Sequence, residues 1–249
     1  CIDNCTKLIR GLADSENEAI FLVAVDTLLT HLLHPYECIV NCIRDILVKL
    51  AASFPHHMVW HLSRSRSCQN RRGYHAEGII NKACNDTAQG LQLRKFYDSF
   101  RIFSNSIKEL ANYKPPKSPT AVVNQIKNGK RKDPNELSLR KVNPVLIKAV
   151  EGLTEADSQF RFIMPCNQLL LPSQFNLNRF ASPNYIDDFF DGLVVEKIDD
   201  EAVVMKSLQM PKKISFLCAD GIRRTLLCKS QDDLRKDRCF LNFANLFNQ

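Results

Sequence analysis

Residues 205–237 read MKSLQMPKKISFLCADGIRRTLLCKSQDDLRKD, and this stretch decides the fold of the C-terminal third of the chain. Apolar residues alternate over positions 213–217, which is typical of a strand with one buried face. Asp220-Gly221 supplies the left-handed residues of a tight hairpin, and a second strand is expected at 225–229. The stretch therefore predicts two paired strands followed by the start of a helix.

Lys229 ends the second of these strands, and Asp237 follows eight positions later. A cation on a rigid strand, steadied by an acid on the next helix, is well suited to contact phosphates. The stretch thus predicts half of a nucleotide site. Taken alone, Lys229 also fits an ordinary strand-end lysine, and Asp232 and Asp233 fit acids that favour a helix N-terminus.

The Lys-x-x-Asp-Asp-Leu-Arg-x-Asp run from Lys229 to Asp237 resembles the small lobe of the phosphatidylinositol-kinase-related protein kinases. The SLQMPKKIS run at 207–215 is most similar to the ATR-type checkpoint kinases within that family. FPHHMVW at 54–60 resembles an element in the last helices of the family's FAT region. The resemblance covers both ends of the chain and is loose over about 113–160.

This resemblance implies which residues would hold the phosphates of ATP. Lys229 would contact the α- and β-phosphates, Asp237 would steady that lysine, and Asp232 would lie beside the nucleotide pocket. The glycine-rich pattern Gly-x-Gly-x-x-Gly is absent. Ser207 and Gln209 would instead donate to the β- and γ-phosphates, together with nearby backbone amides.

The adenine pocket would be walled by Met205, Leu227 and Pro211, for which plain core packing is the alternative. In the family, the residue that orients the attacking hydroxyl and the acids that hold magnesium belong to Asp-Arg-His-x-x-Asn and Asp-Phe-Asp runs. Neither run occurs in the 249 residues. We therefore expect ATP and Mg²⁺ as cofactors of a parent kinase, with no catalytic or metal-binding residue in this chain. Alone, the chain is expected to be inactive and to bind ATP poorly.

Composition restricts the class of protein. With 249 residues and 45% hydrophobic content, the chain can bury one large core or two modest ones. No apolar run approaches the ~20 residues of a membrane span, and the N-terminus lacks Met and a signal pattern, so an internal fragment of a soluble protein is expected. The ten scattered cysteines indicate reduced core thiols, and Cys38 and Cys42 lack a second pair at zinc spacing.

Residues 1–112 carry helical periodicity and are expected to form FAT-type helix pairs of an α-solenoid. Breaks at His34-Pro35, Phe54-Pro55 and the polar run 63–73 separate the helices. Three apolar faces support this division: Phe21, Val25, Leu28 and Leu32; Ile39, Ile43, Ile46, Leu47 and Leu50; and Leu93, Phe96, Phe100, Phe103, Ile107 and Leu110.

Residues 113–160 are expected to be a basic linker and a connecting helix. From Lys114 to Lys148 the chain has nine Lys or Arg against two acidic residues, and its first part contains Pro115, Pro116, Pro119 and Pro134. We expect an exposed loop, and then a helix over 136–150. The alternative for Lys130-Arg131-Lys132 is a nuclear-import or nucleic-acid contact, because clustered cations release counterions from phosphate backbones.

Residues 161–249 are expected to form an incomplete kinase small lobe, an antiparallel meander with one helix. Besides the two strands above, extended segments are expected at 161–164, 168–171, 193–195 and 202–205, with an acidic connector at 185–191. The helix would begin at Asp232 or Asp233 and face the sheet with Phe240, Phe243 and Phe247. The fold class is therefore α+β, with a helical solenoid followed by an antiparallel sheet.

The resemblance implies a nuclear serine/threonine protein kinase that transfers the γ-phosphate of ATP to Ser or Thr, with a preference for a following Gln. It further implies DNA-damage and replication-stress checkpoint signalling. Implied partners are protein substrates, the ATR-interacting protein and single-stranded DNA coated by replication protein A, with these last contacts outside the chain and no membrane involved. The alternative is a non-catalytic scaffold of the same architecture, of the transformation-associated type.

Overall fold

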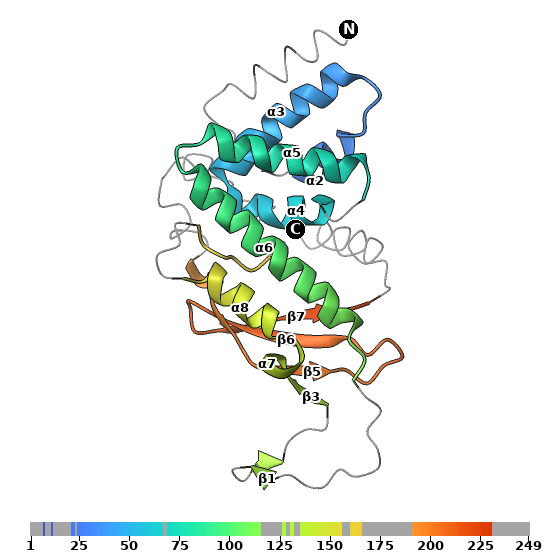
Figure 1. Ribbon diagram of the computed structural model, residues 1–249, viewed down its shortest axis with the longest axis vertical. Helices are drawn as coiled ribbons and strands as arrows, with labels where there is room; N and C mark the ends of the chain where they lie inside the picture. Colours follow the sequence, from blue (N-terminus) through green and yellow to red (C-terminus); the bar gives the residue numbers. More distant parts are fainter. Residues whose placement is uncertain are drawn as a thin grey trace, which may run out of the picture.

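The computed structural model describes residues 7, 11, 21, 22, 24–66, 69–115, 126, 127, 130, 131, 135–155, 160–165 and 191–230. In this part of the chain a group of helices is followed by a five-stranded antiparallel sheet (Figure 1). The longest helix, α6 (Gly90–Asn112), runs from the helical part onto the sheet. The α+β fold class predicted from the sequence is confirmed.

The helical part forms where the sequence breaks predicted its boundaries. Pro55 opens one helix, because its fixed φ suits the first helical position. The Asn70 side chain accepts hydrogen bonds from the amides of Arg72 and Gly73 and so caps the next helix. Neighbouring helices then pack against one another, α3 against α5 and α4 against both α5 and α6. The helices before α6 are α2 (Val25–His31), α3 (Glu37–Ser53), α4 (Pro55–Arg66) and α5 (Arg71–Asp86).

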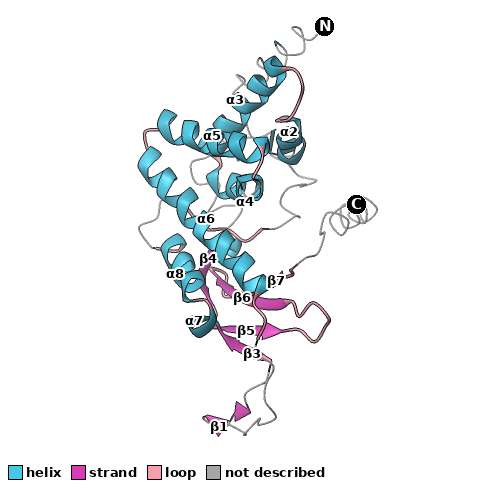
Figure 2. Ribbon diagram, turned by 45° about the vertical axis from the view of Figure 1, so that its right-hand side comes forward, coloured by secondary structure: helices cyan, strands magenta, loops and turns pink. Residues whose placement is uncertain are grey.

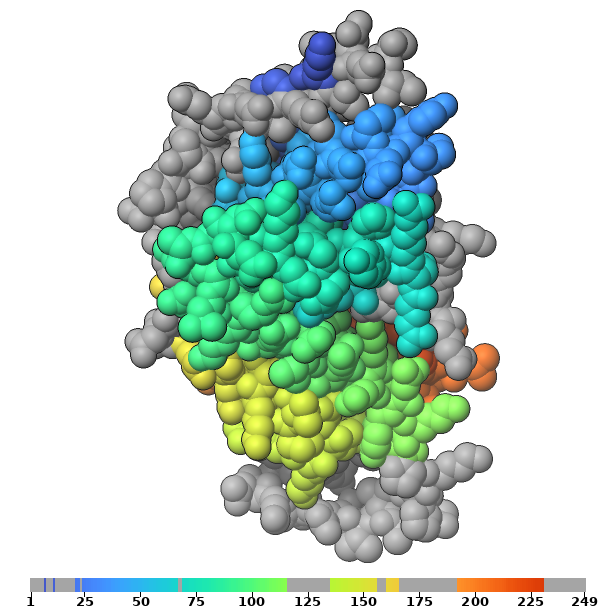
Figure 3. Space-filling model, turned by 45° about the horizontal axis from the view of Figure 1, so that its top comes forward, coloured from blue at the N-terminus to red at the C-terminus, as the bar shows by residue number. Residues whose placement is uncertain are grey.

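Helix α6 joins the two parts because its apolar stripe is buried along its whole length. The stripe predicted from the sequence is confirmed: Ile107 is partly buried and the other members are buried, namely Leu93, Phe96, Phe100, Phe103 and Leu110. The first turns of α6 pack on α4 and α5, and its later turns lie beside α8 (Pro144–Leu153) over the sheet (Figure 2). Helices α5, α6 and α8 present a continuous outer surface (Figure 3).

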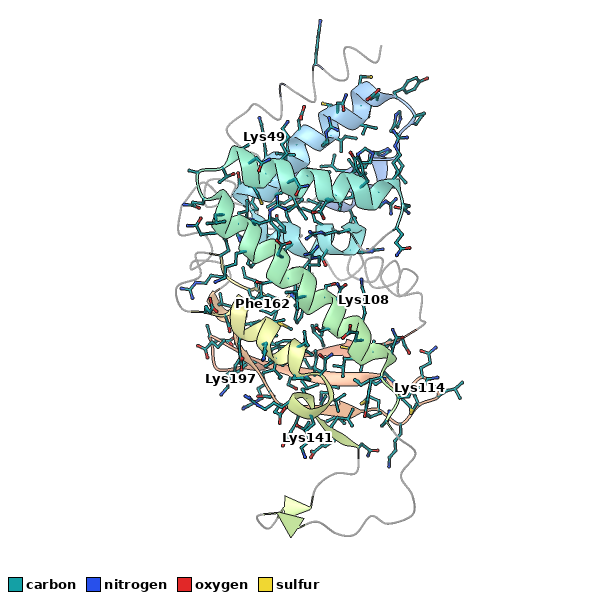
Figure 4. All side chains as sticks on the ribbon, in the orientation of Figure 1. Lys49, Lys108, Lys114, Lys141, Phe162 and Lys197 are labelled. Carbon is teal, nitrogen blue, oxygen red and sulfur yellow. The ribbon has the colours of Figure 1, made fainter. Side chains whose placement is uncertain are left out.

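An aromatic cluster fills the junction between the helices and the sheet. The indole Nε1 of Trp60 donates to the carbonyl of Ile163 over 3.0 Å, and its ring stacks on Phe162 with centroids 5.9 Å apart. Phe162 also meets Phe103 at 5.1 Å and Phe216 at 6.3 Å. Phe162 lies in the interior where α6 approaches the sheet (Figure 4). Such stacked and edge-on aromatic contacts add to the burial of apolar area, so this cluster connects α4 and α6 to the sheet.

The sheet has the order β3-β5-β6-β4, and β7 pairs with the other edge of β6. Its strands are β3 (Glu136–Ser138), β4 (Val195–Ile198), β5 (Glu201–Val204), β6 (Lys212–Cys218) and β7 (Arg223–Cys228). The strands predicted at 202–205, 213–217 and 225–229 are therefore confirmed within one or two residues. Ile163 also forms a bridge to Val194, so the segment predicted as extended at 161–164 contacts the sheet.

The segment 136–150 differs from the single helix that its sequence suggested. It begins with β3, which pairs with β5, and continues as α7 (Leu139–Val142) and α8. Asn143 separates the two helices, because its side chain accepts from the amide of Leu146 and donates to the carbonyl of Ser106 on α6. Pairing of a three-residue strand with β5 at the edge of the sheet thus overrides the local helical pattern.

The β6–β7 hairpin has the predicted turn at Asp220-Gly221. Gly221 has a φ of 74°, in the left-handed region, and the Asp220 carboxylate accepts hydrogen bonds from the Ile222 amide and the Arg224 guanidinium. The hydrogen bonds from Arg224 lower the pKa of Asp220 to about 2. This turn closes the end of the sheet opposite the β5–β6 loop.

Several predictions concern residues only partly within the described chain. Lys130 and Arg131 lie in β2 (Lys130–Arg131), which pairs with β1 (Ile126–Lys127), while Lys132 lies outside the described residues. The segments expected at 168–171 and 185–190, and the helix expected from Asp232 or Asp233, also lie outside them. The domain boundaries 1–112, 113–160 and 161–249 remain predictions.

The five cysteines in the described part of the chain are free thiols, and four of them are buried, which agrees with the prediction of core thiols. In the same part of the chain no three His, Cys, Asp or Glu side chains are grouped to hold a metal ion. Among the helices described, none combines the length and apolar character that crossing a membrane requires.

Candidate nucleotide-binding site

Strand pairing brings the β5–β6 loop and the end of β7 together at one end of the sheet. Lys212 pairs with Val204 on one side and with Cys228 on the other. The pairing of β5 and β6 continues by one residue, because the Met205 amide donates to the Pro211 carbonyl over 2.8 Å. Lys229 follows Cys228 directly, so the register places it at the same end of the sheet as residues 205–211.

The loop 205–211 presents polar groups to solvent. Its backbone is held by hydrogen bonds from the Ser207 amide to the Met205 carbonyl (2.9 Å) and from the Met210 amide to the Ser207 carbonyl (3.0 Å). Ser207 and Gln209 are exposed, and neither side chain hydrogen-bonds to another residue in the described part of the chain. Both side chains are therefore available to a ligand.

Met210 adopts a φ of 44°, in the left-handed region. For a non-glycine residue this conformation costs on the order of 1 kcal/mol. Strain of this kind persists where the surrounding structure imposes it, and it is common in ligand-binding loops. The strained turn at Met210 fixes the conformation of a loop that has no glycine.

The two faces of the sheet differ at this end. Strand alternation puts Lys212, Ile214 and Phe216 on the buried face, beneath α6. Met205 and Leu227 belong to the opposite face, where their side chains are 43% and 49% exposed. They are not core residues within the described structure. Pro211, the third suggested pocket wall, is buried.

Lys229 continues the alternation two residues beyond Leu227, so it belongs to the same outer face. Four of the seven residues proposed for the site from the sequence therefore lie at the same end of the sheet as Lys229: Met205, Ser207, Gln209 and Leu227. Asp232 and Asp237 lie outside the described residues. An outer face with apolar side chains, a lysine and exposed hydrogen-bond donors has the chemistry that a purine and its phosphates require.

Lys212 lies in this region, and the sequence patterns predicted no role for it. Its ammonium Nζ donates to the Ala111 carbonyl of α6 over 2.8 Å, and the residue is 1% exposed. Burial lowers its pKa from the usual lysine value; Cys228 opposes this shift, and the nearby Lys114 adds to it. The sequence does contain a sign of this burial: Lys212 has the same every-second-residue spacing as Ile214, Phe216 and Cys218, which puts a lysine on the apolar face of β6.

Comparison with known proteins finds similarity to one group of protein kinases. The family model "Serine/threonine-protein kinase ATR-like, HEAT repeats" matches residues 4–101. The chain is 23% identical over 245 residues to the serine/threonine-protein kinase ATR of Oryza sativa subsp. indica, covering 97% of this chain and 8% of that protein. It is 23% identical over 249 residues to the serine/threonine-protein kinase MEC1 of Candida albicans, covering 97% of this chain and 9% of the relative.

Over 97% of its length the chain is similar to serine/threonine-protein kinases of the ATR and MEC1 type. It spans less than a tenth of the length of these relatives. The fold is similar to a solved structure of the FAT and kinase domain of CtTel1, with a TM-score of 0.60 at 14% identity, over 93% of this chain and 14% of that one. The match covers both the helices and the five-stranded antiparallel sheet that follows them.

Proposed function

We propose that residues 191–230 of this chain form half of an ATP site in a serine/threonine protein kinase. The supporting observation is the register of β5, β6 and β7, which gathers the 205–211 loop and Lys229 at one end of the sheet. The whole protein would transfer the γ-phosphate of Mg-ATP to Ser or Thr of protein substrates, with a preference for a following Gln. Catalytic and magnesium-binding residues would lie outside this chain.

Each residue at this end has a defined task in the proposal. The Lys229 ammonium neutralises the α- and β-phosphates as a point charge, with Asp237 as its partner and Asp232 beside the pocket. The Ser207 hydroxyl and the Gln209 amide donate to the β- and γ-phosphates. Met205 and Leu227 cover the adenine ring with apolar surface on the outer face. Bound Mg²⁺ would supply charge neutralisation at the β- and γ-phosphates.

The cellular role follows from the similarity to kinases of the ATR and MEC1 type. We infer a nuclear checkpoint kinase that acts in DNA damage and replication stress, with the ATR-interacting protein and single-stranded DNA coated by replication protein A as partners. These contacts would lie outside the chain. A scaffold without nucleotide binding is the competing function, and the cluster of site residues around Lys229 favours the kinase.

Nucleotide binding by the intact protein that contains this chain tests the proposal. Lys229→Met removes a charge-assisted contact worth about 1.5–3 kcal/mol, so the Kd for Mg-ATP should rise about ten- to hundredfold and kinase activity should be lost. Lys197→Met is the matched control, because Lys197 is exposed on β4 of the same sheet and its substitution should leave the Kd unchanged.

Absence of binding at millimolar Mg-ATP in the unsubstituted protein would instead support a scaffold. For the isolated 249-residue chain we expect no phosphate transfer. If the chain alone turned over ATP, and Lys229→Met abolished that turnover, the assignment of the catalytic residues to other parts of the protein would be wrong.

A further inference from the structure

Lys212 is a charged residue buried in the core of the described structure. Among the described Lys, Arg, Asp and Glu residues, it alone is buried, at 1% exposure. Its ammonium contacts a residue 101 positions away, the carbonyl oxygen of Ala111 at 2.8 Å. Removing an ammonium from water is unfavourable unless a partner compensates. The carbonyl of Ala111 is such a partner, because it belongs to the last turn of α6.

The C-terminus of α6 needs a cation that the helix does not carry. The last four carbonyls of a helix have no amide partner within it, and the helix dipole places negative potential at this end. The last turn of α6 contains no basic residue, and its cap is a single backbone hydrogen bond from Tyr113 to Leu110. Lys212 therefore supplies, from the sheet, the charge that a C-terminal Lys or Arg usually supplies from the helix itself.

The backbone of Lys212 is equally well placed with respect to the proposed ATP site. It pairs with Val204, the last residue before the 205–211 loop, and with Cys228, the residue before Lys229. One residue thus joins both phosphate-contacting segments through its main chain and the end of α6 through its side chain. A shift of α6 along its axis would carry the loop and the lysine strand together.

We propose that Lys212 is a positioning residue that ties the ATP end of the sheet to the C-terminus of α6, so that the helical repeats set the geometry of nucleotide binding. This inference rests on the proposed function for its effect on ATP, while the mechanical tie itself does not. An apolar residue would fill the same space without the cost of burying a charge. If an apolar substitution of Lys212 keeps the fold but makes the 205–211 loop less ordered, Lys212 positions the loop and does more than fill space.

Hydrogen exchange in the 249-residue chain tests the tie without nucleotide. In Lys212→Met, the amides of Met205 and Met210, which hold the loop, should exchange about tenfold faster, because one charge-assisted hydrogen bond is lost. Peptides from α3 to α5 should exchange at unchanged rates. Lys197→Met is the control, since Lys197 and Lys114, which follows α6, lie at opposite ends of the sheet (Figure 4). Lys197 pairs with Leu217, at the end of β6 away from Lys212. If Lys212→Met does not fold, Lys212→Gln, which keeps an N–H donor without the charge, should show the same local effect.

Unchanged exchange in the loop, or faster exchange throughout the molecule, would overturn the proposal, because either result makes Lys212 an ordinary core residue. In the intact kinase, Lys212→Met should raise the KM for ATP about tenfold and leave kcat within about twofold. Lys212→Arg should restore most of the affinity, because it keeps the charge and the donor.

The experiments distinguish failure of the proposed ATP site from failure of the proposed role of Lys212. If the intact protein binds no nucleotide, the ATP site is wrong while the exchange result still reports the tie to α6. If ATP binds through Lys229 but the loop of Lys212→Met exchanges normally, the site stands and the positioning role is wrong.

Discussion

Lowering the pH from 7 to 5 should destabilise the chain through two histidines at the start of α4. His56 is buried and His57 is partly buried between helices. Burial, followed by the neighbouring His61, lowers the pKa of His57 from 6.5 to about 4. Burial, followed by the charge of His57, lowers the pKa of His56 well below its ordinary value. In the folded chain both rings therefore stay neutral at a pH where the unfolded chain protonates them.

The sign and size of the effect follow from this difference. A histidine whose pKa is lower in the folded state stabilises the fold above its unfolded pKa of 6.5, and this stability is lost as the pH falls toward the folded value. For His57, the shift from 6.5 to about 4 corresponds to a loss of about 2 kcal/mol between pH 7 and pH 5. The loss reaches about 3 kcal/mol below pH 4. His56 adds a loss of the same sign.

Urea unfolding at pH 7, 6 and 5, followed by circular dichroism, measures this dependence above the range in which ordinary carboxylates titrate. His57→Gln should remove about 2 kcal/mol of the difference between pH 7 and pH 5, whatever its stability at pH 7. His31→Gln, which replaces an exposed histidine at the end of α2, is the matched control and should retain the full dependence. Equal slopes for His57→Gln and the unsubstituted chain would refute the reasoning.

Two further substitutions test the junction and the hairpin. Phe162→Ala should lower the free energy of unfolding in urea by about 3–5 kcal/mol, because Phe162 is 1% exposed and stacked on the indole of Trp60. It should also shift the fluorescence of Trp60, the single tryptophan, to longer wavelength. The control Tyr74→Ala, at a residue 79% exposed, should change stability by less than about 0.5 kcal/mol, and an equal loss in both variants would contradict the role of the cluster. Gly221→Ala should destabilise the chain by about 1 kcal/mol or more, because the φ of Gly221 is 74°. Gly152→Ala, in α8 and with no atom within 4 Å of an added Cβ, should instead stabilise it by about 0.5–1 kcal/mol. Thermal unfolding compares the two variants, and unchanged stability of Gly221→Ala would show that the turn tolerates a side chain.

Local patterns in the sequence were sufficient for most of the elements. The stripe of α6 repeats with the helical period, and the alternation in β6 repeats with the strand period, so each element and its buried face could be predicted from neighbours in the chain. The turn at Asp220-Gly221 likewise depends on the conformational preference of two residues. The family resemblance at 229–237 and 54–60 required only the order of the residues.

Tertiary structure decided the features that depend on residues far apart in the chain. The edge position of β3 could not be predicted from its own residues, because pairing with β5 more than 60 positions away outweighs the helical tendency of the segment. The same holds for Trp60, whose indole meets a carbonyl 103 positions away.

At the candidate site, the resemblance of the sequence predicts which residues contact a nucleotide, and that assignment stays a prediction. The register of three strands decided that Met205, Ser207, Gln209, Leu227 and Lys229 lie at one end of the sheet. The role of Lys212 was decided by the tertiary structure alone. Its parity in β6 indicated a buried position, but only the folded chain brings the end of α6 within 2.8 Å of its ammonium. The physical reason is that periodicity depends on nearest neighbours, whereas the compensation of a buried charge depends on whatever the whole fold places beside it.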